Sequence, residues 1–106
     1  MLLCIDSKGK VLRESEISKG SVNRSLASVR SIMMEALDAE AVHLILMHNH
    51  PSGDPSPSRE DIISTRQVSK AGEILGIILT DHIIIGDLSY CSLKEMGLLS
   101  DETTKP

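Results

Sequence analysis

Residues 42–61 combine an apolar segment, a proline-rich loop and the first turn of a helix. They read Val-His-Leu-Ile-Leu-Met-His-Asn-His-Pro-Ser-Gly-Asp-Pro-Ser-Pro-Ser-Arg-Glu-Asp. The run over 42–47 has the length and composition of a strand buried on both faces of a sheet. The following segment, up to Ser58, holds three of the four prolines and a glycine, which excludes a helix or a regular strand there. Ser58 is then the predicted N-cap of a helix over about residues 59–75 that ends at Gly76.

The flanking segments alternate between predicted strands and helices. Residues 2–6 and 11–17 predict a hairpin with a glycine in its turn, and apolar residues at helical spacing predict an amphipathic helix over 28–40, capped by its first residue, a serine. The later segments predict three more strands and a short helix, at 77–80, 82–85, 90–93 and from about Leu93 onward. This alternation indicates an α/β or α+β layer with a mixed sheet.

Composition sets limits on the class of protein. The chain has 106 residues, enough for one small domain. It is 41% hydrophobic with Tyr90 as its only aromatic residue, so the predicted core is aliphatic. No apolar run reaches the roughly 18 residues of a membrane span, and the first residues do not resemble a signal peptide. Residues 100–106 are predicted to be a disordered tail.

Cysteine usage and charge bear on location and partners. Cys4 and Cys91 are too few and too far apart for a disulfide framework, which favours a reducing, cytoplasmic setting. The net charge is −4 and the basic residues are scattered. Direct nucleic-acid binding is therefore disfavoured, because a nucleic-acid module usually carries a basic stripe. The oligomeric state has no signal in the sequence.

Two histidines and an aspartate form a candidate metal site. His48 and His50 are two residues apart at the end of a predicted strand, so their imidazoles project to the same face. Asp61 lies in the first turn of the next helix, in register with an apolar stripe formed by Thr65, Val68, Ala71, Gly72 and Leu75. That register turns the carboxylate toward the sheet, which is costly unless it is paired or binds a metal. Two histidines and a carboxylate, with a fourth position for water, are typical of a catalytic zinc site.

Other interpretations of these residues stay open. Asp61 can equally close a capping box with Ser58 at the helix N-terminus. Asp54, in the proline-rich loop, is an alternative ligand that lacks a rigid helical position. His82, on a predicted strand, is either a buried structural histidine or a residue that supports the metal ligands.

The spacing of these residues resembles a known family. His48-x-His50, seven residues, Ser58, two residues and Asp61 match the JAMM (MPN) metalloprotease signature HxHx7SxxD at every position. The segments His48–Asp61, Asp81–Gly86 and Tyr90–Leu93 look specifically like the RadC branch of that family. The similarity covers about residues 2–99.

The resemblance implies a fold and a reaction. It implies a deaminase-like three-layer sandwich over residues 1–99, with a mixed sheet flanked by helices. Zinc would be held by His48, His50 and Asp61, with water as the fourth ligand, and the reaction would be hydrolysis of a peptide or isopeptide bond in a peptide or protein substrate. The Ser58 hydroxyl would donate a hydrogen bond to the oxyanion, a role that competes with helix capping.

The sequence departs from the family pattern at the general base. In JAMM enzymes a glutamate lies just before or at the start of the strand that here begins at Leu2, and this sequence has none in that place. Glu14 and Glu16 are the nearest acids and are expected to be solvated. The sequence therefore looks like the C-terminal portion of a longer RadC protein, without its helix-hairpin-helix segment. We expect metal binding with weak hydrolysis, because losing a general base costs on the order of 10² to 10⁴ in rate.

Two other functions compete with the peptidase. One is a non-enzymatic, zinc-containing interaction module associated with DNA repair or replication complexes. The other, a ferrous oxygenase with a two-histidine-one-carboxylate triad, fits less well, because those sites usually sit in all-β barrels.

Overall fold

The structure, a computed structural model, describes residues 1–16, 28–50 and 52–99. The predicted tail at 100–106 lies outside these residues. Along the chain the elements are β1 (Leu2–Ile5), β2 (Val11–Ser15), α1 (Val29–Asp38), β3 (His43–Asn49), α2 (Arg59–Leu75), β4 (Ile78–Ile85) and β5 (Tyr90–Ser92).

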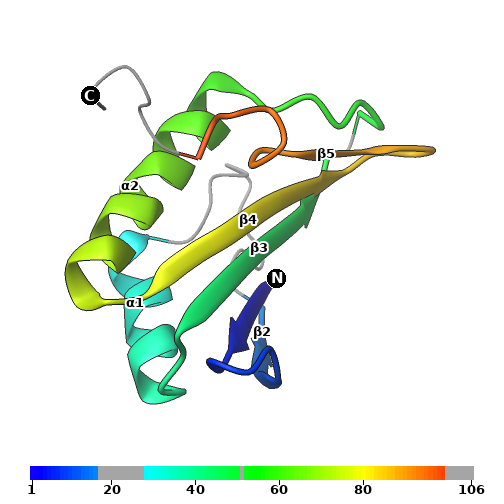
Figure 1. The fold of residues 1–106 in the computed structure, drawn as a ribbon. Helices are drawn as coiled ribbons and strands as arrows, with labels where there is room; N and C mark the ends of the chain where they lie inside the picture. Colours follow the sequence, from blue (N-terminus) through cyan, green and yellow to red (C-terminus); the bar gives the residue numbers. More distant parts are fainter. Residues whose placement is uncertain (17–27, 51, 100–106) are drawn as a thin grey trace.

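The strands form one mixed sheet in the order β2-β1-β3-β4-β5 (Figure 1). Only β3 and β4 are parallel, and α2 connects them. The other neighbouring pairs are antiparallel. This arrangement confirms the predicted α/β class with a mixed sheet.

The β1–β2 hairpin forms as predicted around a tight turn. Gly9 has φ 88°, which favours glycine. The carboxylate of Asp6 accepts hydrogen bonds from the backbone N–H groups of Lys8 and Lys10, each at 2.9 Å. The conformation of this turn therefore depends on Gly9 and Asp6, two residues within the turn itself.

Capping residues define the helix ends. The Ser28 hydroxyl oxygen accepts a hydrogen bond from Ser31 N–H at 3.1 Å and begins α1. Ser58 is the N-cap of α2, and Gly76, with φ 78°, ends it in the left-handed conformation. The bounds of α2 are those predicted, whereas α1 ends two residues earlier than the predicted 40.

A bulge joins the two strands predicted at 77–80 and 82–85 into the single strand β4. Leu44 of β3 lies opposite Leu79, but the next pair is Ile45 with Asp81, so Thr80 has no partner. An extra residue of this kind shifts the alternation of side chains along a strand. His82 consequently lies opposite a buried residue of β3, Leu46, and is itself buried.

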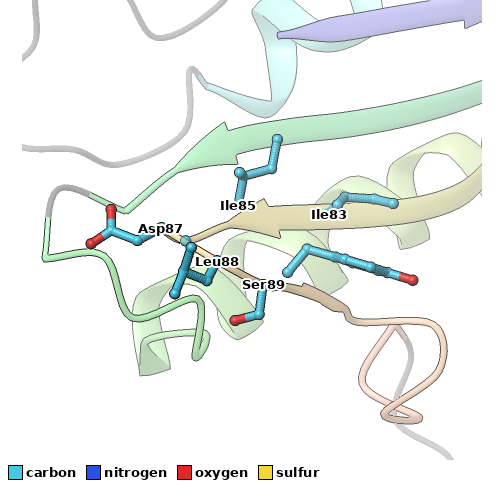
Figure 2. Close-up of a pocket in the computed structure, with 7 residues that line it drawn as sticks. Ile83, Ile85, Asp87, Leu88 and Ser89 are labelled. Carbon is cyan, nitrogen blue, oxygen red and sulfur yellow. The ribbon is translucent and has the colours of Figure 1, made fainter.

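The turn between β4 and β5 borders a shallow hollow of about 480 Å³ (Figure 2). Its walls include Ile83 and Ile85, which alternate with the buried Ile84 and therefore lie on the opposite face of the sheet. Leu88 at the tip of the turn is fully exposed. After β5 the chain makes hydrogen-bonded turns over residues 93–97 in place of the predicted short helix.

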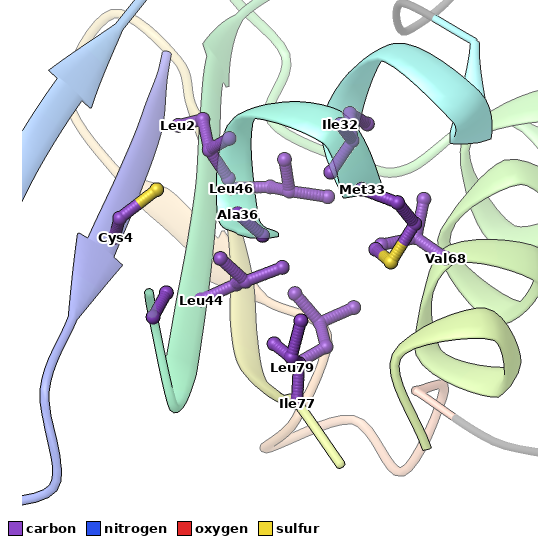
Figure 3. Close-up of a cluster of buried hydrophobic side chains, with 11 residues drawn as sticks. Leu2, Cys4, Ile32, Met33, Ala36, Leu44, Leu46, Val68, Ile77 and Leu79 are labelled. Atoms are coloured by element: carbon purple, nitrogen blue, oxygen red, sulfur yellow. The ribbon is translucent and has the colours of Figure 1, made fainter. Parts of the chain in front are cut away.

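Both helices pack on the same face of the sheet around an aliphatic core (Figure 3). The core takes Leu2 and Cys4 from β1, Leu44 and Leu46 from β3, Ile32, Met33 and Ala36 from α1, and Val68 from α2. The described residues thus make two layers of the expected sandwich. Leu75, predicted to face the core, is 46% exposed and is the last residue of α2. Neither helix in the described ranges is long and apolar enough to cross a membrane.

Candidate metal centre

Three side chains converge where β3 ends and α2 begins. His48 and His50 project from the end of β3 to the same face, with ring centroids 4.9 Å apart. Asp61, in the first turn of α2, lies between them, with Oδ1 3.6 Å from His48 Nε2 and Oδ2 3.0 Å from His50 Nε2. One ligand atom from each residue lies within 4.8 Å of the others. The predicted inward orientation of Asp61 is confirmed, since its side chain is only 8% exposed.

The hydrogen bonds of His50 leave its lone pair facing a carboxylate. His50 Nδ1 lies 2.9 Å from the backbone carbonyl oxygen of Asp54. A carbonyl can only accept, so Nδ1 carries the hydrogen. In the neutral ring, Nε2 is then an acceptor that faces the Asp61 oxygen, another acceptor, at 3.0 Å. Two acceptors at this distance require a proton or a metal cation between them.

A chain of hydrogen bonds links His48 to two buried polar residues. Its Nδ1 lies 2.9 Å from Nε2 of His82, and Nδ1 of His82 lies 2.6 Å from the Thr65 hydroxyl. Thr65 donates in turn to the backbone carbonyl of Asp61 at 2.6 Å. His82 and Thr65 are fully buried. His82 is therefore a satisfied, buried structural histidine, and it also contacts the candidate ligand His48, so its support of a metal ligand stays a prediction.

Asp61 serves the site and the helix at the same time. Its Oδ2 accepts a hydrogen bond from Ser58 N–H at 2.8 Å, and Asp61 N–H donates to the Ser58 hydroxyl oxygen at 3.0 Å. Burial raises the pKa of Asp61, but the N–H and hydroxyl groups of Ser58, together with the nearby His48, outweigh burial and leave the pKa below its ordinary value. The capping box and the inward carboxylate, weighed as alternatives from the sequence, are both present.

Burial shapes the protonation of the two histidines that contact each other. It lowers the pKa of His48, although the Asp61 carboxylate opposes this shift. Burial, reinforced by His48, lowers the pKa of His82 to about 4. Both rings are therefore neutral at pH 7, and a neutral imidazole is the form that binds metals.

Two loops meet in close backbone contact beside the site. Asp87 N–H donates to the Gly53 carbonyl at 3.0 Å, and His50 N–H donates to the Ile85 carbonyl at 3.1 Å. A Cβ on Gly86 would lie 2.4 Å from the Gly53 oxygen. This contact ties the loop that carries the Asp54 carbonyl, and so the orientation of His50, to the β4–β5 turn.

The remaining candidate residues lie outside the cluster. Asp54 is exposed, and its carboxylate accepts from Ser56 N–H at 3.0 Å, so only its backbone contacts the site. Glu14 is exposed and lies opposite Leu3, on the sheet face away from the helices. Cys4 is fully buried in the core, as predicted.

Sequence reasoning missed the contributions of Thr65 and Gly86. Thr65 was only part of the apolar stripe, although a hydroxyl four residues after Asp61 can donate to that residue's backbone carbonyl. The close approach of Gly86 to another loop has no local signal in the sequence.

The fold and the site together define a class: an α/β domain in which two histidines at the end of a strand and a helix aspartate form a group able to hold a metal ion. A family profile described as RadC-like JAB domain matches residues 1–98. The chain belongs to this family, which confirms the resemblance found in the sequence.

Similar curated proteins are named without an activity. UPF0758 proteins are 46% identical over 99 residues in Pelobacter propionicus, 47% over 97 residues in Methanosarcina barkeri and 48% over 99 residues in Trichlorobacter lovleyi. These matches cover 92–93% of this chain but only 42–43% of each relative. The chain thus spans about two fifths of the length of these relatives.

Proposed function

We propose that this chain is a zinc-dependent hydrolase domain of the metallopeptidase or isopeptidase type. His48, His50 and Asp61 would hold the ion, and the substrate would be a peptide or protein amide. The observation that carries the proposal is the set of facing acceptors, in which Asp61 oxygens lie 3.0 and 3.6 Å from imidazole nitrogens. Membership of the RadC-like JAB family supports the same assignment.

The donor set fits zinc in number and type, and its atoms are close enough to converge on one ion. Ligand atoms about 2.0–2.1 Å from a tetrahedral zinc ion lie roughly 3.4 Å from one another. His48 Nε2 lies 3.6 Å from Oδ1 of Asp61 and His50 Nε2 lies 3.0 Å from Oδ2, and one ligand atom from each of the three residues lies within 4.8 Å of the others. Three protein ligands also leave one position for water, as in catalytic rather than structural zinc sites. When bound, zinc would supply Lewis acidity and lower the pKa of a water molecule from 15.7 toward about 7.

Ser58 would contribute a hydrogen-bond donor. Capping uses a lone pair of its oxygen, which accepts from Asp61 N–H, so the hydroxyl hydrogen, which also stabilises the Asp61 carboxylate, would have to turn from that carboxylate to a substrate. Ser58 is exposed at the mouth of the cluster. A donor to a developing oxyanion contributes roughly 3 kcal/mol, against about 1 kcal/mol for a helix cap.

A non-enzymatic zinc module, associated with DNA repair or replication complexes, is the second candidate. It is favoured by one observation: in residues 1–16, 28–50 and 52–99, no second carboxylate joins the metal-ligand group to act as general base. The two candidates share zinc binding and differ only in turnover.

Zinc binding is tested by titrating chelator-treated protein with zinc and measuring affinity and stoichiometry. We expect one zinc per chain. Asp61→Asn should abolish this binding, whereas Glu60→Gln, an exposed acid in the same helical turn, should bind normally. Less than about a tenth of an equivalent in the unsubstituted chain would refute the proposal.

Turnover is tested on zinc-loaded protein with a library of peptide and isopeptide substrates. We expect weak cleavage that is lost in Asp61→Asn and reduced in Ser58→Gly, since glycine keeps most of the capping energy. Tight zinc binding with no cleavage at any substrate would establish the non-enzymatic module instead.

A further inference from the structure

We propose that His82 is a positioning residue that fixes the tautomer of His48, so that the Nε2 lone pair of His48 faces the metal site. The inference rests on the proposed metal function and names the chain of hydrogen bonds that prepares one ligand. It runs from His48 through His82 and Thr65 to the backbone of Asp61.

The direction of each hydrogen bond follows from one acceptor. The Asp61 carbonyl can only accept, so the single hydroxyl hydrogen of Thr65 points to it over 2.6 Å. The Thr65 oxygen must then accept from Nδ1–H of His82 over 2.6 Å. This leaves the Nε2 lone pair of a neutral His82 to accept from Nδ1–H of His48 over 2.9 Å. Nε2 of His48 therefore carries a lone pair toward the Asp61 carboxylate.

Burial excludes the other arrangement. If His82 were charged, both of its nitrogens would donate, and His48 would have to accept on Nδ1 and carry its hydrogen on Nε2, facing the site. His82 is fully buried, and a buried charge is strongly disfavoured; the nearby Asp61 and Asp81 carboxylates favour the charged form but do not outweigh burial. Nδ1 of His82 meets a hydroxyl rather than a carboxylate, so nothing in direct contact with the ring nitrogens stabilises the charged form.

The β4 bulge brings His82 to this position. Because Thr80 is unpaired, His82 rather than Asp81 lies opposite Leu46 on the helix-facing side of the sheet. Asp81 turns instead to the other side, where its carboxylate accepts from Ser92 and from the backbone of His82. A neutral imidazole donates one hydrogen bond and accepts one. Because His82 donates to Thr65, it must accept from His48, and this fixes the hydrogen of His48 on Nδ1.

The tautomers are tested directly by long-range ¹H–¹⁵N NMR on the zinc-free chain near pH 7. We expect both His48 and His82 to be protonated on Nδ1 only. A hydrogen on Nε2 of His48 would overturn the inference. This measurement needs neither a variant nor bound metal, so it decides the inference even if the chain proves unable to bind zinc.

Variants test the consequence for the metal ligand. His82→Leu should weaken zinc binding about 10- to 100-fold, as loss of a hydrogen-bond partner of a ligand does, and alter the visible absorption of the cobalt-substituted protein. His82→Gln, whose amide can both accept and donate, should recover most of the loss. His43→Leu is the matched control, because His43 is a half-buried histidine on β3 that contacts Thr80 instead of the site.

The outcomes separate this inference from the proposed function. Unchanged zinc affinity and cobalt spectrum in a folded His82→Leu, with normal binding by the unsubstituted chain, would refute the positioning role alone. No zinc binding by the unsubstituted chain would refute the proposed function alone. If His82→Leu fails to fold, Thr65→Val and the NMR tautomers decide.

Discussion

Gly86→Ala should damage the metal centre without touching a ligand. The added Cβ would lie 2.4 Å from the Gly53 carbonyl oxygen and 2.8 Å from Cδ of Pro55. Favourable contacts begin near about 3.5 Å, so the loop would have to retreat by roughly 1 Å. The clash falls mainly on backbone, which cannot rotate away as a side chain can. Gly86 does not have a positive φ, so the expected effect is steric rather than conformational.

The expected cost combines overpacking with a lost hydrogen bond. Overpacking costs about 1–3 kcal/mol, and loss of the bond from Asp87 N–H to the Gly53 carbonyl about 1 kcal/mol more. We therefore expect unfolding in urea to show a loss of about 2–4 kcal/mol. Retreat of the loop also carries the Asp54 carbonyl away from His50 Nδ1, now 2.9 Å distant. Zinc affinity should fall about tenfold or more as His50 loses its orienting partner.

Gly97→Ala is the matched control for this substitution. Gly97 has φ 73° and nothing within 4 Å of its added Cβ. Alanine there should cost about 1–2 kcal/mol of conformational strain and leave zinc affinity unchanged. The reasoning would be refuted if Gly86→Ala kept both the stability and the zinc affinity of the unsubstituted chain.

Three further perturbations have expected outcomes. Burial holds the folded pKa of His82 near 4, below the ordinary 6.5, so the unfolded state binds more protons between these values. The free energy of unfolding of the zinc-free chain should therefore fall by up to about 3 kcal/mol as the pH drops from 6.5 to 4. Measured by urea unfolding at each pH, it should depend less on pH in His82→Gln than in the unsubstituted chain. Leu46→Ala, at a fully buried position, should cost about 2–5 kcal/mol in the same assay; a loss below about 1 kcal/mol would contradict the core described above. Gly76→Ala places a Cβ in open space at φ 78°, so thermal unfolding should show only the strain of the left-handed cap, about 1–2 kcal/mol, with zinc affinity intact.

Local signals in the sequence were sufficient for α2 and for the three candidate ligands. Ser58 and Gly76 mark helix ends by chemistry that acts within a few residues, and both bounds of α2 match. The two-residue spacing of His48 and His50 likewise fixes a common face in any strand. The helical stripe was correct at Thr65, Val68 and Gly72. It failed at Leu75, the last residue of α2, because periodicity shows which way a residue points but not whether other residues cover it.

The sequence could not predict the residues that act through tertiary contacts. In an unbroken strand, alternation from Leu79 would place Asp81 on the core side. The bulge at Thr80 reverses this and buries His82 beside the site. The bulge depends on pairing with β3 across the sheet, so no local sequence pattern predicts it. The contact between Gly53 and Gly86 is similar, because it joins loops more than thirty residues apart.

The capping box at the start of α2 would couple any metal binding at the candidate site to the winding of the helix. The oxygen of Asp61 that faces His50 is the same atom that accepts from Ser58 N–H, and the Asp61 carbonyl receives the Thr65 hydroxyl. If the first turn of α2 unwound, the Asp61 carboxylate would move away from the two histidines. The hydrogen bond from Thr65 to the Asp61 carbonyl, which orients the Thr65 hydroxyl toward His82, would also be lost. Binding of a metal ion would therefore be coupled to the stability of this first turn, and slowed amide exchange in the first turn of α2 would accompany it.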